Sequence, residues 1–270
     1  MRSAGPKGRA KSSSRRKPSW STITPLALRH WYGGASVLTL QTREIGRVTV
    51  VRCAGRIVLG DPAEALRSHI IHLLRDRRAL VLHLGEVGFI DSSGLGTMVR
   101  SLTSIRRVHG DLKLCNVTEQ VRKVLEMSRL TQVFDVHESE EKAVAAFYRT
   151  GAPAGVPAET PVPTGRGILC VDCNRDVLAY LRELLRRAGY DVQSTSHPGD
   201  ALILMRITNF DLLLAGPDLT TSPATQQAFQ VACKRLPVIE LGSEFSNRDA
   251  GEAGAALLEE IEARLNPKTA

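Results

Sequence analysis

The chain has 270 residues, 43% of them hydrophobic and 24% charged, which is enough for two domains that each bury an apolar core. Its apolar runs fall well short of the roughly 18 residues that a membrane-spanning helix needs, so we expect no transmembrane segment. Five cysteines without a framework spacing favour a reducing, cytoplasmic compartment over a secreted one.

The net charge of +8 comes from the N-terminus, because residues 1–40 hold eight Lys and Arg and no acid, which leaves 28 basic and 28 acidic residues in the rest. A basic segment rich in Ser, Gly and Pro buries too little apolar surface to offset the entropy lost on ordering. We therefore expect residues 1–37 to form a disordered basic tail. The tail has the charge to contact anionic lipid or nucleic acid, but no specific nucleic-acid partner is expected.

Residues 150–165 read TGAPAGVPAETPVPTG, in which four prolines, small residues and one charge do not support periodic burial. Such a composition is typical of a semi-extended linker. The linker divides the chain into one domain at 38–149 and another at 166–268.

In the first domain, Asp61-Pro62-Ala63-Glu64 supplies an N-cap, a proline at N1 and a glutamate at N3, so a helix is expected to begin there. Apolar periodicity gives the other elements. In chain order we expect a strand at 47–53, the helix from 61, a strand at 79–84, a helix through 95–105, a strand at 111–117, a helix at 118–130, a strand at 133–136 and a helix at 138–149. This alternation predicts an α/β domain with a parallel or mixed sheet covered by helices.

The second domain shows the same alternation. We expect strands at 167–171, 191–195, 211–215 and 237–241 and helices at 176–188 and 252–265, so this domain is also predicted to be α/β.

The segment FIDSSGLG at 89–96 lies where a buried strand ends and an amphipathic helix begins. Backbone amides are unpaired at such a junction, and Asp91 and Ser92 are residue types that cap them. Gly94 and Gly96 let the backbone turn tightly or a partner approach closely. Asp-Ser-Ser-Gly is also a common capping phrase, so local chemistry alone leaves a purely structural role open.

This segment, with GRIVLGDPAEALR before it and GDLKLCNVTEQVRKVLEMSRLTQVFDVHESEEKAVAAF after it, resembles the STAS family of anti-sigma factor antagonists over about residues 38–149. The resemblance implies a STAS-type sheet covered by helices. It also implies that Ser93, the second serine of the phrase, is phosphorylated. Asp91, Ser92 and Gly94 would form the partner-binding loop, with Asp61 as a further acid near the same face.

The resemblance further implies a mechanism. The unphosphorylated antagonist binds an anti-sigma factor with serine kinase activity and so frees a sigma factor, and a phosphatase of the PP2C type resets the phosphorylated form. A homodimer is left open. The alternative is a STAS scaffold that does not switch and binds a small ligand or a membrane-associated complex, with the basic tail as a tether.

Residues 167–243 resemble a response-regulator receiver domain, which implies a flavodoxin-like parallel sheet with helices on both faces. The residues of receiver chemistry are missing, however. Asp172 is followed by Cys173 where receivers have a second acid for Mg²⁺, Gly216 stands at the phosphoacceptor position, and Gly242 replaces the switch hydroxyl. Asp218 is two residues out of place as a substitute acceptor. We expect a pseudo-receiver that binds a partner, dimerises, packs on the first domain or merely stabilises the chain.

An enzyme is not expected, because paired carboxylates, a phosphate-binding glycine loop and a nucleophile-base set are not found. Cys170 and Cys173 form a CxxC, and His69 and His72 share a helix face, but neither pair has further ligands at metal-binding spacing. No cofactor or metal is therefore expected.

Overall fold

The computed structural model describes residues 21–23, 38–149, 165–217, 219, 221–242, 245 and 250–266. The expected linker, most of the expected tail and Asp218 lie outside the described residues. Within these ranges, no helix is both long enough and apolar enough to cross a membrane.

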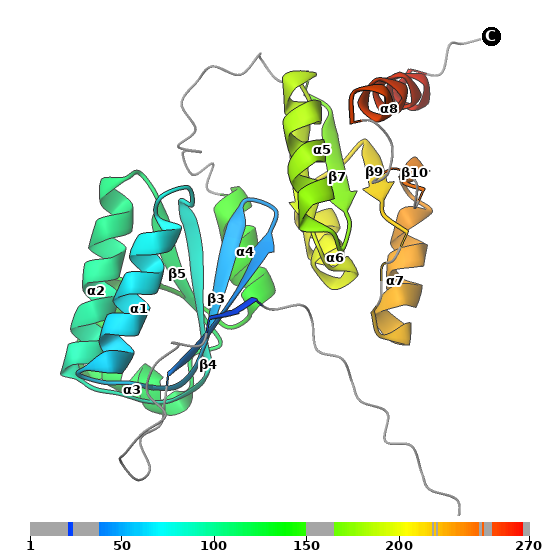
Figure 1. The fold of residues 1–270 in the computed structure, drawn as a ribbon. Helices are drawn as coiled ribbons and strands as arrows, with labels where there is room; N and C mark the ends of the chain where they lie inside the picture. The colour runs from blue at the N-terminus through cyan, green and yellow to red at the C-terminus, as the bar shows by residue number, and fades with distance from the viewer. Residues whose placement is uncertain are drawn as a thin grey trace, which may run out of the picture.

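The first domain is built on a six-stranded mixed sheet in the order β1-β2-β3-β4-β5-β6 (Figure 1). Its strands are β1 (Ser21–Ile23), β2 (Thr39–Ile45), β3 (Val48–Ile57), β4 (Ala79–Ile90), β5 (Asp111–Cys115) and β6 (Asp135–His137). Its helices are α1 (Asp61–Leu73), α2 (Ser92–Arg107), α3 (Glu119–Met127), a 3-10 turn at Leu130–Gln132 and α4 (Glu140–Arg149). Strands β1 to β3 pair antiparallel, and β3 to β6 pair parallel. Three residues of the expected tail therefore form a strand.

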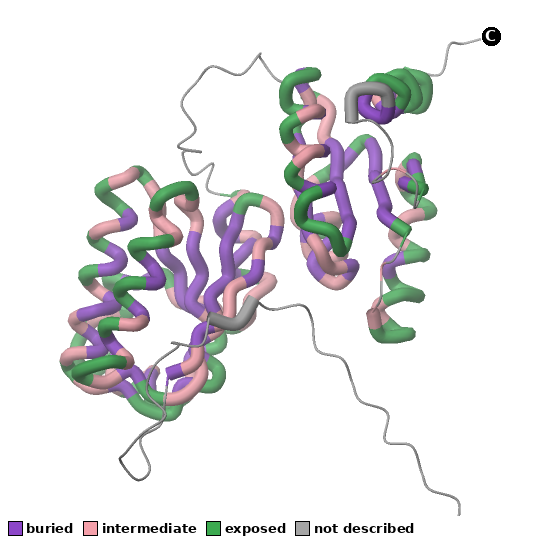
Figure 2. The backbone as a smooth tube through the Cα atoms, viewed as in Figure 1, coloured by how far each residue is buried: buried purple, intermediate pink, exposed green. Residues whose placement is uncertain are grey.

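The two faces of this sheet are covered by different helices, with α1 and α2 on one side and α4 on the other (Figure 1). Side chains alternate between the faces, as the two-residue period of a strand requires. In β4, Leu80, Leu82 and Leu84 join the core beneath α1 and α2, while Val81 joins the core beneath α4. Figure 2 shows the strands as the buried centre of the domain.

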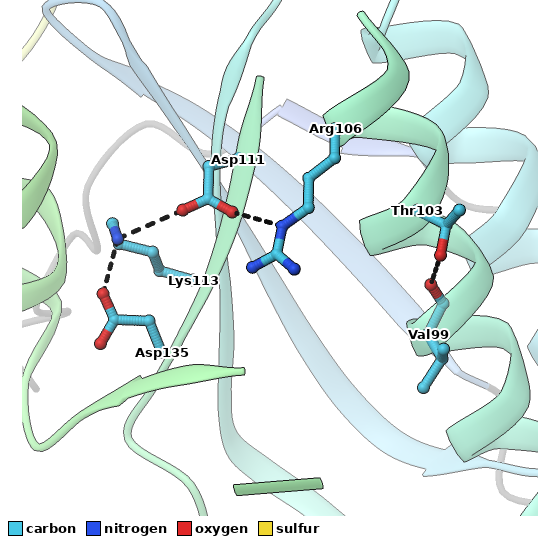
Figure 3. Close-up of polar contacts among 6 residues, drawn as sticks. All are labelled: Val99, Thr103, Arg106, Asp111, Lys113 and Asp135. Carbon is cyan, nitrogen blue, oxygen red and sulfur yellow. Dashed lines mark hydrogen bonds and ion pairs between the residues drawn. The ribbon is translucent and has the colours of Figure 1, made fainter. Parts of the chain in front are cut away.

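A small ionic cluster links the C-terminal end of α2 to β5 and β6, the last two strands of the sheet (Figure 3). Lys113 of β5, 5% exposed, contacts Asp135 of β6 at 2.6 Å and Asp111 at 3.3 Å. Arg106, in the last turn of α2, contacts the other oxygen of Asp111 at 3.4 Å. Because a cation is also favourable at a helix C-terminus, Arg106 holds this end of α2 in two ways.

The second domain is a four-stranded parallel sheet in the order β10-β9-β7-β8. Its elements are β7 (Gly167–Val171), α5 (Arg175–Arg187), β8 (Asp191–Thr195), α6 (Pro198–Ile207), β9 (Leu212–Ala215), α7 (Pro223–Cys233), β10 (Val238–Glu240) and α8 (Ala250–Leu265). Buried residues of α5 and α8 form one core with one face of the sheet, and those of α6 and α7 pack on the other face. Helices on both faces confirm the expected flavodoxin-like arrangement.

The two domains share one apolar cluster. Val48 of β3 and Phe147 of α4 belong to the same buried cluster as Leu169 of β7 and Leu204 of α6. Helix α6 contacts both β2 and α4, and β2 contacts β8. In Figure 1 the hairpin of β2 and β3 faces the second domain. The second domain therefore packs on the first domain, which is one of the four roles considered for it.

Three sequence predictions need correction. Helix α1 is capped by Gly60, at φ 97°, and not by Asp61, which is the first helical residue and makes no capping hydrogen bond. The helix starts one residue early because glycine adopts the positive φ that the entering turn requires. Ser92 is likewise the first residue of α2 and does not cap it. Strand β4 runs on to Ile90, six residues beyond its expected end, and thereby reaches the loop before α2.

Candidate functional site

The loop between β4 and α2 is fastened by Asp91. Asp91 is the N-cap of α2 in extended conformation, and its Oδ1 accepts a hydrogen bond from the Gly94 amide at 2.8 Å. Its Oδ2 accepts a second one, at 2.9 Å, from the amide of Leu59 in the loop between β3 and α1. One carboxylate thus satisfies an amide of the helix N-terminus and joins two loops that are 32 residues apart in the sequence.

These contacts keep Asp91 ionised. Partial burial acts to raise its pKa, but hydrogen bonds from the backbone amides of Gly94, Leu59 and Ser93 and the charge of Arg56 outweigh burial, so the pKa is lowered. A lowered carboxyl pKa stabilises the fold above the ordinary pKa of aspartate, and that stabilisation is lost as the pH falls through the lowered pKa. At neutral pH the carboxylate therefore holds both loops at full strength.

Gly94 is needed at its position because the backbone of β3 passes directly against it. A Cβ on Gly94 would collide with the carbonyl oxygen of Ile57 and lie 2.9 Å from Ile57 C and from Ile90 Cγ1. Gly96 is different, since a Cβ there would meet nothing closer than the flexible end of Arg100, at 3.3 Å. The first glycine of the motif is a close-packing residue, and the second is replaceable.

Ser92 and Ser93 occupy the first turn of α2. Ser92 is exposed and Ser93 half-buried, while Gly94 and Leu95 behind them are buried. Unpaired amides and the helix dipole give this turn a partial positive charge, which favours an anion. A negative group added to Ser93 would be placed where the helix tolerates it. Helix α2 is anchored in the core by Met98 and Leu102, which are fully buried.

Apolar side chains stand exposed beside this turn. Leu59 is 75% exposed and Phe89 is 44% exposed, and the Arg56 guanidinium lies 4.7 Å from the centre of the Phe89 ring. Sequence reasoning missed these three residues. The signal for Leu59 and Phe89 was an apolar residue two or three positions before a helix start, which cannot be told from a core residue without the fold.

Asp61 is exposed at the first position of α1. The Asp91–Leu59 hydrogen bond brings the loop that precedes Asp61 against the loop that precedes Ser93. The structure therefore brings the expected partner-binding loop at Asp91, Ser92 and Gly94 and the loop before Asp61 into one surface.

In the second domain, the space beside Gly216 is filled. Asp172, at the end of β7, is 5% exposed and accepts a hydrogen bond from the Asn174 amide at 2.7 Å. Its carboxylate fills the space beside Gly216, where a Cβ would collide with Oδ2 and lie 2.6 Å from Cγ. At Gly216, where the sequence places the missing phosphoacceptor, there is thus neither a carboxylate nor room for one.

The cysteine pair and the histidine pair noted in the sequence lie apart from the surface around Ser93. Cys170 is buried on β7 and burial raises its pKa to about 12, whereas Cys173 is exposed. His69 is buried, with its Nε2 2.7 Å from Thr42 Oγ1. Its pKa is lowered mainly by burial and also by the charge of the nearby His72. Among the described residues, no group of three or more His, Cys, Asp or Glu has the placement of a metal site.

Comparison with known proteins agrees with this geometry. The STAS domain family matches residues 39–143. The Bordetella bronchiseptica protein BtrV, named as an anti-sigma factor antagonist, is 33% identical over 105 residues, which cover 38% of this chain and 90% of BtrV. The anti-sigma-B factor antagonist of Bacillus subtilis is 29% identical over 94 residues, covering 35% of this chain and 85% of the relative.

The chain therefore belongs to the STAS-domain family of anti-sigma factor antagonists. Among solved structures, the chemotaxis response regulator CheY4 of Vibrio cholerae superposes with a TM-score of 0.30 at 19% identity, over 37% of this chain and 98% of CheY4.

Proposed function

We propose that this protein is an anti-sigma factor antagonist that acts by reversible binding, with Ser93 as the residue whose phosphorylation ends that binding. The partner is an anti-sigma factor with serine kinase activity, and a phosphatase of the PP2C type restores the binding form. The observation that carries the proposal is the position of Ser93, half-buried in the first turn of α2.

Electrostatics favours a switch of binding over a switch of folding. A phosphate brings about −1.5 to −2 charges and three acceptor oxygens. At the N-terminus of α2 those charges meet amides and the positive end of the dipole, so the fold tolerates them. A partner seated over the same turn would have to desolvate the dianion, which is costly unless the partner pairs it.

The neighbouring surface supports a protein partner. Leu59, whose amide binds Asp91, and Phe89, two residues before Asp91, offer apolar area near the cap, and Arg56 and Asp61 supply charge nearby. Interfaces commonly combine an exposed aromatic residue and an arginine in this way. The exposed apolar side chains are then explained by the partner that covers them, without any catalytic group.

Phosphate transfer to one serine tests the proposal. Full-length protein is incubated with radiolabelled ATP and each candidate anti-sigma factor kinase encoded in the same genome. We expect one kinase to label the wild type and the Ser92→Ala control, and to leave Ser93→Ala unlabelled. If no kinase labels the wild type, or if label persists in Ser93→Ala, the switch is wrong and a non-switching STAS scaffold is favoured.

A further inference from the structure

The junction between the two domains encloses one arginine and two carboxylates. Arg43 of β2 forms ion pairs with Glu140 of α4, in its own domain, and with Asp200 of α6 in the second domain, the latter at 2.8 Å. The three side chains are 9%, 18% and 2% exposed, respectively. When all three are ionised, the trio carries a net charge of −1 in a site that is almost closed to water.

The backbone around the trio is tightly fitted. The Gly46 amide, at the turn between β2 and β3, donates a hydrogen bond to the Ser194 carbonyl across the junction at 3.2 Å. A Cβ on Gly46 would collide with Tyr148 Oη and lie 2.6 Å from Gln193 Oε1. Tyr148 Oη itself donates to Gln193 Oε1 at 3.1 Å. The Gly46 amide is therefore a direct reporter of whether the domains are docked.

Asp200 is the poorly compensated member of the trio. Its Oδ2 is buried and has no hydrogen-bond partner among the described residues, although the Thr195 side chain donates a hydrogen bond to the carboxylate, which shares Arg43 with Glu140. A buried carboxylate with incomplete pairing is costly, and a proton on it would remove the excess charge. In keeping with this geometry, burial raises the pKa of Asp200 to about 7, although the charge of Arg43 opposes the rise.

We infer that docking of the second domain onto the first is linked to the uptake of a proton by Asp200, so that the junction at Arg43 is a pH-sensitive latch. The sign follows from linkage. Asp200 exposed to water has an ordinary pKa near 3.8, so the docked state holds the proton more tightly than the undocked state. The contribution to docking is complete below the ordinary pKa and is lost as the pH rises through about 7.

Two histidines also face the trio. His197, the N-cap of α6, lies near Arg43, and His83 of β4 lies near Glu140. Burial lowers the pKa of both, and for His197 the charge of Arg43 across the junction lowers it further, so protonation of His197 opposes docking in acid. Cys115, also near Glu140, has its pKa raised by burial to about 12 and stays neutral. A variant that changes Asp200 alone keeps all these groups, so its difference from wild type isolates Asp200.

The latch leaves the Ser93 surface free. Gly46 lies just before β3. At the other end of β3, the Ile57 carbonyl accepts a hydrogen bond from the Asp91 amide beside Ser93. Ten residues of strand separate the two points by about 30 Å. A partner at Ser93 and the second domain at Arg43 therefore bind opposite ends of one strand.

Hydrogen exchange of the Gly46 amide in the full-length chain tests the latch. Its protection is measured by NMR from pH 6 to pH 8 and divided by the intrinsic exchange rate at each pH. We expect the protection of wild type relative to Asp200→Asn to rise about tenfold between pH 8 and pH 6. Proton uptake by a group with a docked pKa near 7 raises the docking equilibrium constant about tenfold over that range.

The matched control is Arg206→Gln, which removes the exposed Arg206–Glu141 pair of the same junction. This variant should keep the wild-type pH profile. Parallel profiles for wild type and Asp200→Asn would overturn the inference. So would a loss of protection in Asp200→Asn at every pH, since the charge of Asp200 would then hold the domains together.

Discussion

Replacing Gly94 by alanine is expected to lower the free energy of unfolding by about 2 kcal/mol or more. Alanine is the better helix former by about 1 kcal/mol, so the exchange would be stabilising in an open helix. Here the new methyl group collides with the Ile57 carbonyl, which is backbone and cannot rotate away. In the variant, strand β3 and helix α2 must therefore move apart, which strains the hydrogen bonds of the Asp91 cap. Urea unfolding of the full chain measures the loss.

Gly96→Ala is the matched control, two residues along the same helix. Its methyl group meets only the movable end of Arg100. This variant should be as stable as wild type or up to about 1 kcal/mol more stable. Equal stabilities for the Gly94→Ala and Gly96→Ala variants would show that β3 and α2 do not approach as closely as described.

Replacing Arg43 by methionine is expected to cost about 3 kcal/mol or more, because it leaves Glu140 and Asp200 buried without their shared cation. The loss arises mainly from the abandoned carboxylates and less from the arginine itself. Thermal unfolding at pH 8, above the pKa of about 7 to which burial raises Asp200, should show the largest difference.

Two comparisons separate that cause from a general effect of charge. Arg206→Met removes a pair whose side chains are 66% and 42% exposed, and should cost under about 1 kcal/mol. The double variant Arg43→Met, Asp200→Asn should lose less than the single Arg43→Met variant, since one of the abandoned charges is gone. An Arg43→Met variant as stable as Arg206→Met would contradict the buried trio.

Sequence periodicity predicted most elements because the apolar spacing and the capping residues of each element lie within a short stretch of chain. The capping residues Asp91 and Thr118 begin α2 and α3 as expected, and the strands at 167–171 and 191–195 match β7 and β8. Strand β2 was missed because Thr39–Ile45 is rich in polar residues, several of which pair only with distant partners. Helices α6 and α7 were missed as elements, since α6 is apolar on most sides and α7 buries little.

The motif at Asp91 was found from sequence because strand end, cap and glycine are adjacent in the chain. Its wider surface was not, because Leu59 reaches Asp91 across 32 residues and is apolar yet exposed. The Arg43 junction could not be predicted from the sequence, because its three residues come from β2, α4 and α6. At Gly216 the sequence indicated a missing acceptor, and the structure adds that Asp172 fills its place.

Charge at Ser93 is proposed to control binding without disturbing the fold. The direct measurement is the affinity of the labelling kinase for the full-length Ser93→Ala and Ser93→Asp variants, by titration calorimetry, with circular dichroism to compare their folding. We predict that Ser93→Ala binds like wild type and that Ser93→Asp binds at least about 100-fold more weakly, or about 2.8 kcal/mol. Equal affinities for two equally folded variants would contradict the account.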